Sequence, residues 1–182
     1  MNEHIAHSGA WGIALIVIVI ASWLLYRYLA PKTWREWASA GVIQAFIIAL
    51  YAEMYGFPLT IYLLVRFFGL DATYLNASLW STLLGVGEVG MMISMLFGYL
   101  ILFVGLGIFM AGWRQLHSAR QEKRLVTDGL YGMVRHPQYT GLFIAIFGEG
   151  IVHWPTIFSV ALFPVIIFAY VKLARSEERK VL

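Results

Sequence analysis

An uncharged apolar run over residues 91–113 constrains the fold of this chain more than any other stretch of its sequence. A helix of that length rises about 35 Å, whereas the hydrocarbon core of a bilayer is about 30 Å thick. Lipid offers no hydrogen-bonding partner to the backbone, so a continuous run of this kind crosses a membrane only as a helix. The run therefore predicts a transmembrane helix.

Four further stretches are also apolar. Together with the run at 91–113 they predict five helices, at residues 11–29, 38–57, 91–113, 138–153 and 156–174. Pro58 ends or kinks the second helix, and the apolar residues 58–70 are too few to span, which favours an interfacial or re-entrant segment. Residues 71–87 are typical of a loop with room for a short helix. Residues 114–135 favour a helical extension followed by a turn at residues 127–129. We expect an all-α integral membrane protein with about five transmembrane helices.

The composition of the chain supports this class. Its 182 residues are 60% hydrophobic and 13% charged, with a mean hydropathy of +0.75, and a soluble domain of this length cannot bury so much apolar surface. The basic residues flank the apolar runs, so we expect no nucleic-acid partner despite a pI near 9.2. The absence of cysteine excludes a disulfide framework and a thiolate site. No repeat is visible, and residues 1–182 are expected to form a single domain without a cleaved signal peptide.

The placement of lysine and arginine predicts the orientation of the chain. All 13 basic residues except Arg66 lie in the loop after the first helix, between the third and fourth helices, or around the end of the fifth. Cytoplasmic loops are enriched in lysine and arginine. We therefore expect the N-terminus outside, the C-terminus in the cytoplasm, and both the segment around Arg135 and residues 175–182 on the cytoplasmic face.

The longest polar interruption, residues 125–141, reads LVTDGLYGMVRHPQYTG and carries the candidate chemistry. Pro137 is suited to the first turn of a helix, where its missing N–H costs no hydrogen bond. The free N–H groups of that turn, together with Arg135, favour an anion such as a carboxylate. His136 and Tyr139 add a titratable group and a phenol beside it, and Gly129 lets the backbone approach a ligand closely.

This segment, with the pair Glu177–Glu178 after one helical hairpin, resembles the C-terminal region of isoprenylcysteine carboxyl methyltransferases. Phospholipid N-methyltransferases and membrane thiol methyltransferases have similar regions. The shared pattern is V-T-x-G-x-Y-x-x-x-R-H-P-x-Y, then the hairpin, then the glutamates, and it covers residues 125–182, about a third of the chain. The resemblance implies methyl transfer from S-adenosylmethionine to a lipophilic, membrane-partitioned acceptor.

The resemblance also implies a cytoplasmic cofactor site built from residues 113–141 and 175–182. Arg135 suits the cofactor's carboxylate, a glutamate suits its ammonium or sulfonium group, and backbone near Val126 flanks the adenine. Gln115 and His117 end the third span on the same side and are candidates for lining the site. The expected cofactor-binding residues are Gln115, His117, Val126, Gly129, Tyr131, Arg135, His136, Tyr139, Glu177 and Glu178. No Gly-x-Gly-x-x-Gly motif within a βαβ unit is present, and no metal site is expected.

The acceptor is left open among a lipophilic carboxylate, a phospholipid amine and a small thiol. A carboxylate is already ionised and needs only an arginine to orient it, and family resemblance points to Arg175 or Arg179. An amine or thiol needs a base, for which His136 is the candidate. The expected catalytic residues are therefore Arg135, His136, Arg175 and Arg179. Family members usually continue past the glutamates with an aromatic-rich tail, whereas this sequence ends at Leu182.

Two other classes of function remain as alternatives: an NADPH-dependent protein like the membrane sterol reductases, and a non-catalytic membrane scaffold. The oligomeric state is open. A second group of acids, Glu53, Glu88 and Glu149, falls toward the outer half of the membrane, where acids are costly and are functional candidates by default. A structural network with Arg66 or His153 explains them equally well. Glycines of the third and fourth spans predict close helix packing, at Gly98, Gly105, Gly107, Gly112, Gly141, Gly148 and Gly150.

Overall fold

The computed structural model describes residues 10–29, 33–69, 79–85, 87–122 and 125–181, and every regular element in these ranges is a helix. The elements are α1 (Trp11–Leu29), α2 (Trp34–Tyr55), α3 (Leu59–Phe68), α4 (Leu79–Leu84), α5 (Gly87–Gln121), α6 (Leu130–Met133), α7 (Pro137–Phe147), the π-helix η2 (Gly148–His153) and α8 (Ile157–Val181). The prediction of an all-α protein is confirmed for the described residues.

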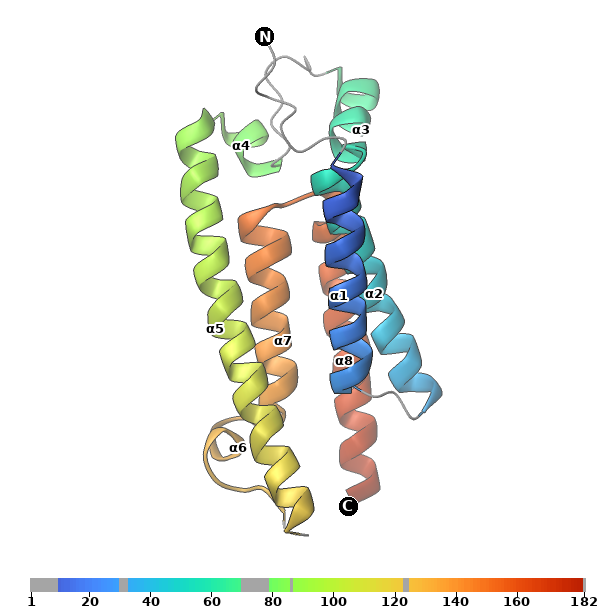
Figure 1. Cartoon of the computed structure of the whole chain (residues 1–182), viewed down its shortest axis with the longest axis vertical. Coiled ribbons are helices and arrows are strands. Elements are labelled where there is room, and N and C mark those ends of the chain that lie inside the picture. Colours follow the sequence, from blue (N-terminus) through green and yellow to red (C-terminus); the bar gives the residue numbers. More distant parts are fainter. Residues whose placement is uncertain (1–9, 30–32, 70–78, 86, 123–124, 182) are drawn as a thin grey trace.

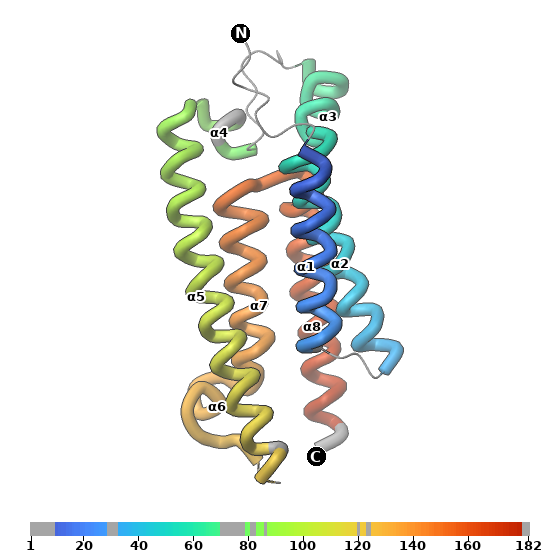
Figure 2. The backbone as a smooth tube through the Cα atoms, in the orientation of Figure 1, coloured from blue at the N-terminus to red at the C-terminus, as the bar shows by residue number. Residues whose placement is uncertain are grey.

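The long helices run along one axis, and the short helices lie at its ends (Figure 1). Helices α3 and α4 lie at one end, whereas α6 and the C-terminal end of α8 lie at the other, as the tube view also shows (Figure 2). Helix α1 packs on α2, α2 on α8, and α5 on both α7 and η2. The segment around Arg135 and the pair of glutamates therefore share one end of the bundle, as expected, while Arg66 on α3 lies at the opposite end.

Four of the predicted spans are confirmed as helices long and apolar enough to cross a membrane: Trp11–Tyr28, Trp34–Tyr55, Gly87–Ala119 and Ile157–Arg179. These four helices support an integral membrane protein. The fifth, predicted at 138–153, is present as α7 with 11 residues followed by η2 with 6. The two together are shorter than the other four helices, and neither is a candidate span by itself.

Three helices can be compared with their predicted bounds, and local capping explains the earlier start of α2. Helix α2 begins at Trp34 rather than at residue 38, because Thr33 and Glu36 form a capping box that satisfies two free N–H groups. Helix α5 continues to Gln121, which confirms the predicted polar extension. Helix α8 continues to Val181 rather than ending at residue 174, so the two glutamates lie within its last turns.

Glycines bring α5 into close contact with α7 and η2. A Cβ atom at Gly105 would lie 2.7 Å from the Gly141 carbonyl oxygen, and one at Gly148 would lie 2.5 Å from the Leu102 nitrogen. The predicted close packing is confirmed at these positions and at Gly98, Gly112 and Gly150, each of which faces a neighbouring segment. Gly107 faces open space, so the same prediction is wrong there.

Aromatic rings join α7 to α8. Tyr139 and Tyr170 pack edge to face with ring centroids 5.2 Å apart, and Phe143 contacts the same tyrosine at 6.1 Å. Near the far end, Phe147 and Phe163 are 5.7 Å apart. Tyr139 and Tyr170 are both buried members of the main hydrophobic core.

The buried acids at the far end of the bundle form hydrogen bonds with neighbouring side chains. Glu149 accepts a hydrogen bond from Tyr51 at 2.8 Å and lies 3.1 Å from Nδ1 of His153. Glu53 accepts one from Thr60. The expected network with His153 is therefore confirmed for Glu149, while Glu88 is exposed at the start of α5.

Candidate functional site

The connection between α5 and α7 is organised around Gln115. Gly129, with φ +60°, precedes α6, and its backbone packs directly on the Gln115 side chain. Gln115 Oε1 also accepts a hydrogen bond from the Leu130 nitrogen at 3.2 Å. A side chain at position 129 would be strained by the positive φ and would collide with Gln115. The predicted turn therefore forms, and it fixes the four-residue helix α6 against α5.

Helix α7 begins as its sequence predicts, with Pro137 in the first turn. The preceding residue, His136, is the N-cap, and its carbonyl oxygen accepts hydrogen bonds from the Tyr139 and Thr140 nitrogens at 3.0 Å each. Within this region Tyr131 donates to Gln138 Oε1 at 2.8 Å, which ties α6 to α7. The segment thus presents Arg135 and His136 at the start of a fixed helix.

The last turns of α8 bring the two glutamates to this helix start. Tyr139 donates a hydrogen bond to Glu177 Oε1 at 2.9 Å. Arg135 Nη1 lies 3.5 Å from Glu178 Oε1, and His136 Nε2 lies 3.4 Å from the same oxygen. His136 also stacks on the Tyr139 ring, with centroids 5.4 Å apart. The two halves of the sequence motif therefore meet as one cluster, which we call the Arg–Glu cluster: Arg135, His136, Tyr139, Glu177 and Glu178.

The Arg–Glu cluster combines opposite charges within reach of solvent. The Arg135 side chain is 85% exposed and that of Glu178 is 34% exposed, whereas His136 is 22% exposed. Nε2 of His136 is buried and has no partner with hydrogen-bond geometry. A surface ion pair of this kind contributes at most about 1 kcal/mol to stability. The ion pair can therefore open at little cost, and each of its two charges can then pair with the opposite charge of a zwitterionic ligand.

Not every predicted site residue joins the Arg–Glu cluster. Gly129 lies in the adjoining turn, which Gln115 of α5 supports and which Tyr131 of α6 follows. Val126 is half-buried in the irregular segment before the turn. His117 is exposed and lies 3.1 Å from the Gln121 amide, away from the site. Arg175 and Arg179 line a different surface, toward α2, rather than the face of α8 that carries the glutamates.

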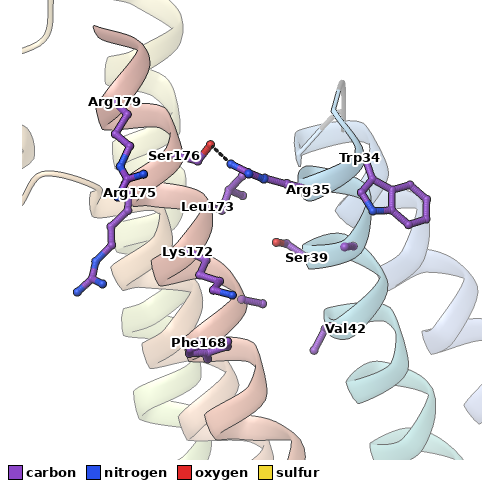
Figure 3. A pocket seen from close by; sticks show the side chains of 12 residues that line it. Trp34, Arg35, Ser39, Val42, Phe168, Lys172, Leu173, Arg175, Ser176 and Arg179 are labelled. Carbon is purple, nitrogen blue, oxygen red and sulfur yellow. Dashed lines mark hydrogen bonds between the residues drawn. The ribbon is translucent and has the colours of Figure 1, made fainter. Parts of the chain in front are cut away.

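That surface was not foreseen from the sequence. A groove of about 660 Å³ runs between α2 and α8 and is lined by Arg35, Lys172, Arg175 and Arg179 together with apolar residues (Figure 3). Arg35 donates to Ser176 Oγ at 2.8 Å across 141 residues of sequence, and no local motif signals a contact between positions so far apart. A smaller cavity of about 340 Å³ adjoins the groove and reaches Glu177.

A model of the isoprenylcysteine carboxyl methyltransferase family matches residues 90–182, just over half of this 182-residue chain. The matched region contains nearly all of α5, all of α6 to α8, and every residue of the Arg–Glu cluster. No curated protein and no solved structure matches the chain. In the part of the chain that the structure describes, no group of three or more His, Asp or Glu side chains is placed to hold a metal ion.

Proposed function

Because this chain belongs to the isoprenylcysteine carboxyl methyltransferase family, and is therefore a membrane methyltransferase, we propose that it transfers a methyl group from S-adenosylmethionine to a lipophilic acceptor drawn from the bilayer. The observation that carries this proposal is the contact between Arg135 and Glu178. These residues are distant in sequence: Arg135 lies just before α7, and Glu178 lies in the last turns of α8. A membrane protein needs no such polar meeting point to pack its helices.

The charges of the Arg–Glu cluster fit the amino-acid end of S-adenosylmethionine. That end carries a carboxylate and an ammonium group, and Arg135 and Glu178 are a cation and an anion 3.5 Å apart. The guanidinium can bind a carboxylate through two parallel hydrogen bonds, and the glutamate can accept from the ammonium. The ligand thus replaces one ion pair by two.

The remaining residues of the site are assigned by their position. Tyr139 holds Glu177 through a 2.9 Å hydrogen bond, so this second carboxylate can compensate the positive sulfonium of a bound cofactor. The turn at Gly129, supported by Gln115, offers backbone on which the adenosine can lie. Val126 and Tyr131 border the same turn.

S-adenosylmethionine supplies an activated methyl group, which the acceptor takes as the carbon–sulfur bond breaks and a neutral thioether leaves. The protein's task is mainly to align the two partners and exclude water. A carboxylate acceptor needs no proton removed. For an amine or thiol acceptor, His136 is the candidate base, because it is the titratable imidazole of the Arg–Glu cluster and its side chain is 22% exposed.

The proposal is tested by thermal unfolding of the purified protein in detergent with S-adenosylmethionine, S-adenosylhomocysteine or NADPH. A ligand that binds only the folded state at about 100 times its Kd stabilises it by about 2.7 kcal/mol. We expect both adenosyl ligands to raise the melting temperature by several degrees and NADPH to leave it unchanged. Stabilisation by NADPH alone would identify a reductase, and no stabilisation by any of the three would favour a scaffold.

A further inference from the structure

The groove between α2 and α8 is amphipathic along its length. Its walls carry four cations, Arg35, Lys172, Arg175 and Arg179, and no acidic residue lines it. Its other lining residues are largely apolar, among them Val42 and Phe168. Figure 3 shows the cations along the end of α8 and the start of α2, with Phe168 and Val42 further along the two helices. A positive rim thus adjoins an apolar channel.

Among the described residues, no acidic side chain lines this rim. Arg175 and Arg179 are exposed, and neither forms an ion pair with any residue in the described ranges. Lys172 Nζ lies 4.8 Å from the centre of the Phe168 ring, so its charge is held beside the apolar channel. Arg35 is directed toward α8 by its bond to Ser176. The groove lining thus carries four cations and no acid, and the nearest acids among the pocket-lining residues are Glu36 and Glu177 of the smaller adjoining cavity.

Arg175 and Arg179 of this rim project from a different face of α8 than Glu178 of the Arg–Glu cluster, although the smaller cavity beside the groove reaches Glu177. Successive residues of a helix are about 100° apart, so residues 172, 175 and 179 share one face of α8 and Glu178 projects from a different one. Accordingly, Glu178 contacts Arg135 and His136 of the α7 segment, while Arg175 and Arg179 line the groove toward α2. A ligand that pairs with Arg135 and Glu178 therefore does not use the side chains of Arg175 and Arg179.

We propose that this groove binds an anionic phospholipid, whose phosphate pairs with Arg175, Arg179 and Lys172 and whose acyl chain follows Val42 and Phe168. Arginine pairs with phosphate through parallel hydrogen bonds, and basic pockets between membrane helices recognise anionic headgroups. The groove lies between two candidate spans, Trp34–Tyr55 and Ile157–Arg179, and its positive rim is at the end of the bundle where the basic residues collect. A phospholipid matches both halves of the groove, whereas a soluble phosphate matches only the rim.

The site is tested by thermal unfolding of the full chain in a neutral detergent supplemented with phosphatidylglycerol, phosphatidylcholine or glycerol 3-phosphate. We expect phosphatidylglycerol to raise the melting temperature in a saturable way that weakens with salt, and the other two to have little effect. The double variant Arg175→Gln/Arg179→Gln should need at least about tenfold more phosphatidylglycerol for the same shift. The control Arg114→Gln removes an exposed arginine from α5 at the same end of the bundle, and it should respond as the wild type does.

Two results would overturn the assignment. The first is an equal response of the double variant and the wild type to phosphatidylglycerol, and the second is full stabilisation of the wild type by glycerol 3-phosphate. A folding defect is recognised by a lower melting temperature without lipid, in which case the single variant Lys172→Gln takes the place of the double variant under the same criteria. Titration with S-adenosylmethionine distinguishes a failure of this lipid site from a failure of the proposed cofactor site. The double variant should bind the cofactor with the same affinity as the wild type.

Discussion

The substitution Glu178→Gln separates a cofactor-binding role of the Arg–Glu cluster from a merely structural one. It keeps the shape of the side chain and removes its charge. In the structure Glu178 lies 3.5 Å from Arg135 and 3.4 Å from His136, so its ion-pair partners are not Arg175 and Arg179, its neighbours in sequence. The carboxylate also lies in the last turns of α8, where the negative end of the helix dipole disfavours an anion.

The two effects on the free protein nearly cancel. Losing an exposed ion pair costs at most about 1 kcal/mol, and the Arg135 side chain is 85% exposed. Removing an anion from the C-terminal end of a helix stabilises the folded protein by about 0.3 to 1 kcal/mol. We therefore expect the melting temperature without ligand to stay within about 2 °C of the wild type, or to rise slightly.

The effect on the bound state is larger. A hydrogen bond between a carboxylate and an ammonium group contributes about 1.5 to 3 kcal/mol, so the affinity for S-adenosylmethionine should fall roughly 10- to 150-fold. Isothermal titration in detergent measures this change. Glu122→Gln is the matched control, because it removes an exposed glutamate that follows α5 at the same end of the bundle and accepts a hydrogen bond from Ser118 Oγ at 3.3 Å.

The reasoning would be refuted by an affinity of the Glu178→Gln protein within twofold of the wild type. It would also be refuted by an equal loss in the Glu122→Gln protein, since the effect would then come from the general negative potential of that end. A loss of affinity together with a large drop in the melting temperature of the free protein would indicate that the ion pair is structural.

Three further predictions concern the cofactor, the orientation and the helix packing. Arg135→Lys keeps the charge but loses the bidentate geometry, so titration should show S-adenosylmethionine affinity at least about tenfold weaker with unchanged membrane insertion, and an unchanged affinity would remove Arg135 from the site. In this cysteine-free chain, Asp128→Cys should be shielded from an impermeant external thiol reagent in intact cells and Phe67→Cys on α3 should be labelled; the reverse pattern would invert the predicted topology. Gly105→Ala should lower the free energy of unfolding by about 1 to 3 kcal/mol, because its Cβ would lie 2.7 Å from the Gly141 oxygen. Gly107→Ala, with nothing within 4 Å, should be neutral or stabilising by up to about 1 kcal/mol, and equal thermal shifts of the two variants would contradict the packing.

The sequence predicted the elements better than their contacts. Uncharged apolar runs locate helices because hydrophobicity and length act locally, and α1 was predicted with the bounds it has. Pro137 at the start of α7 and Gly129 at positive φ were likewise predictable, because the backbone preferences of proline and glycine do not depend on distant contacts. The start of α2 was misplaced because the capping box at Thr33 and Glu36 is polar and lies outside the apolar run on which the prediction rested.

The site was predictable only as far as the resemblance reached. It grouped Arg135 and His136 with the glutamates, and the structure brings these residues together. It did not indicate that Arg175 and Arg179 face away from that cluster, because residue type alone does not reveal the direction of a side chain on a helix whose neighbours are unknown. Nor did it indicate the bond of Arg35 to Ser176, which depends on the packing of α2 against α8.

The contact between α5 and α7 is closer than the contact between α7 and α8. Helix α5 and helix α7 meet backbone to backbone at Gly105 and Gly141, so we expect them to shift little against each other, whereas α7 reaches α8 through rings such as Tyr139 and Tyr170. Arg135 lies just before α7, and Glu178 lies in α8. A ligand that binds both residues would link the α5–α7 pair to α8. We therefore expect it to restrict the sliding of α8 against that pair, also in parts of the bundle that the ligand does not contact.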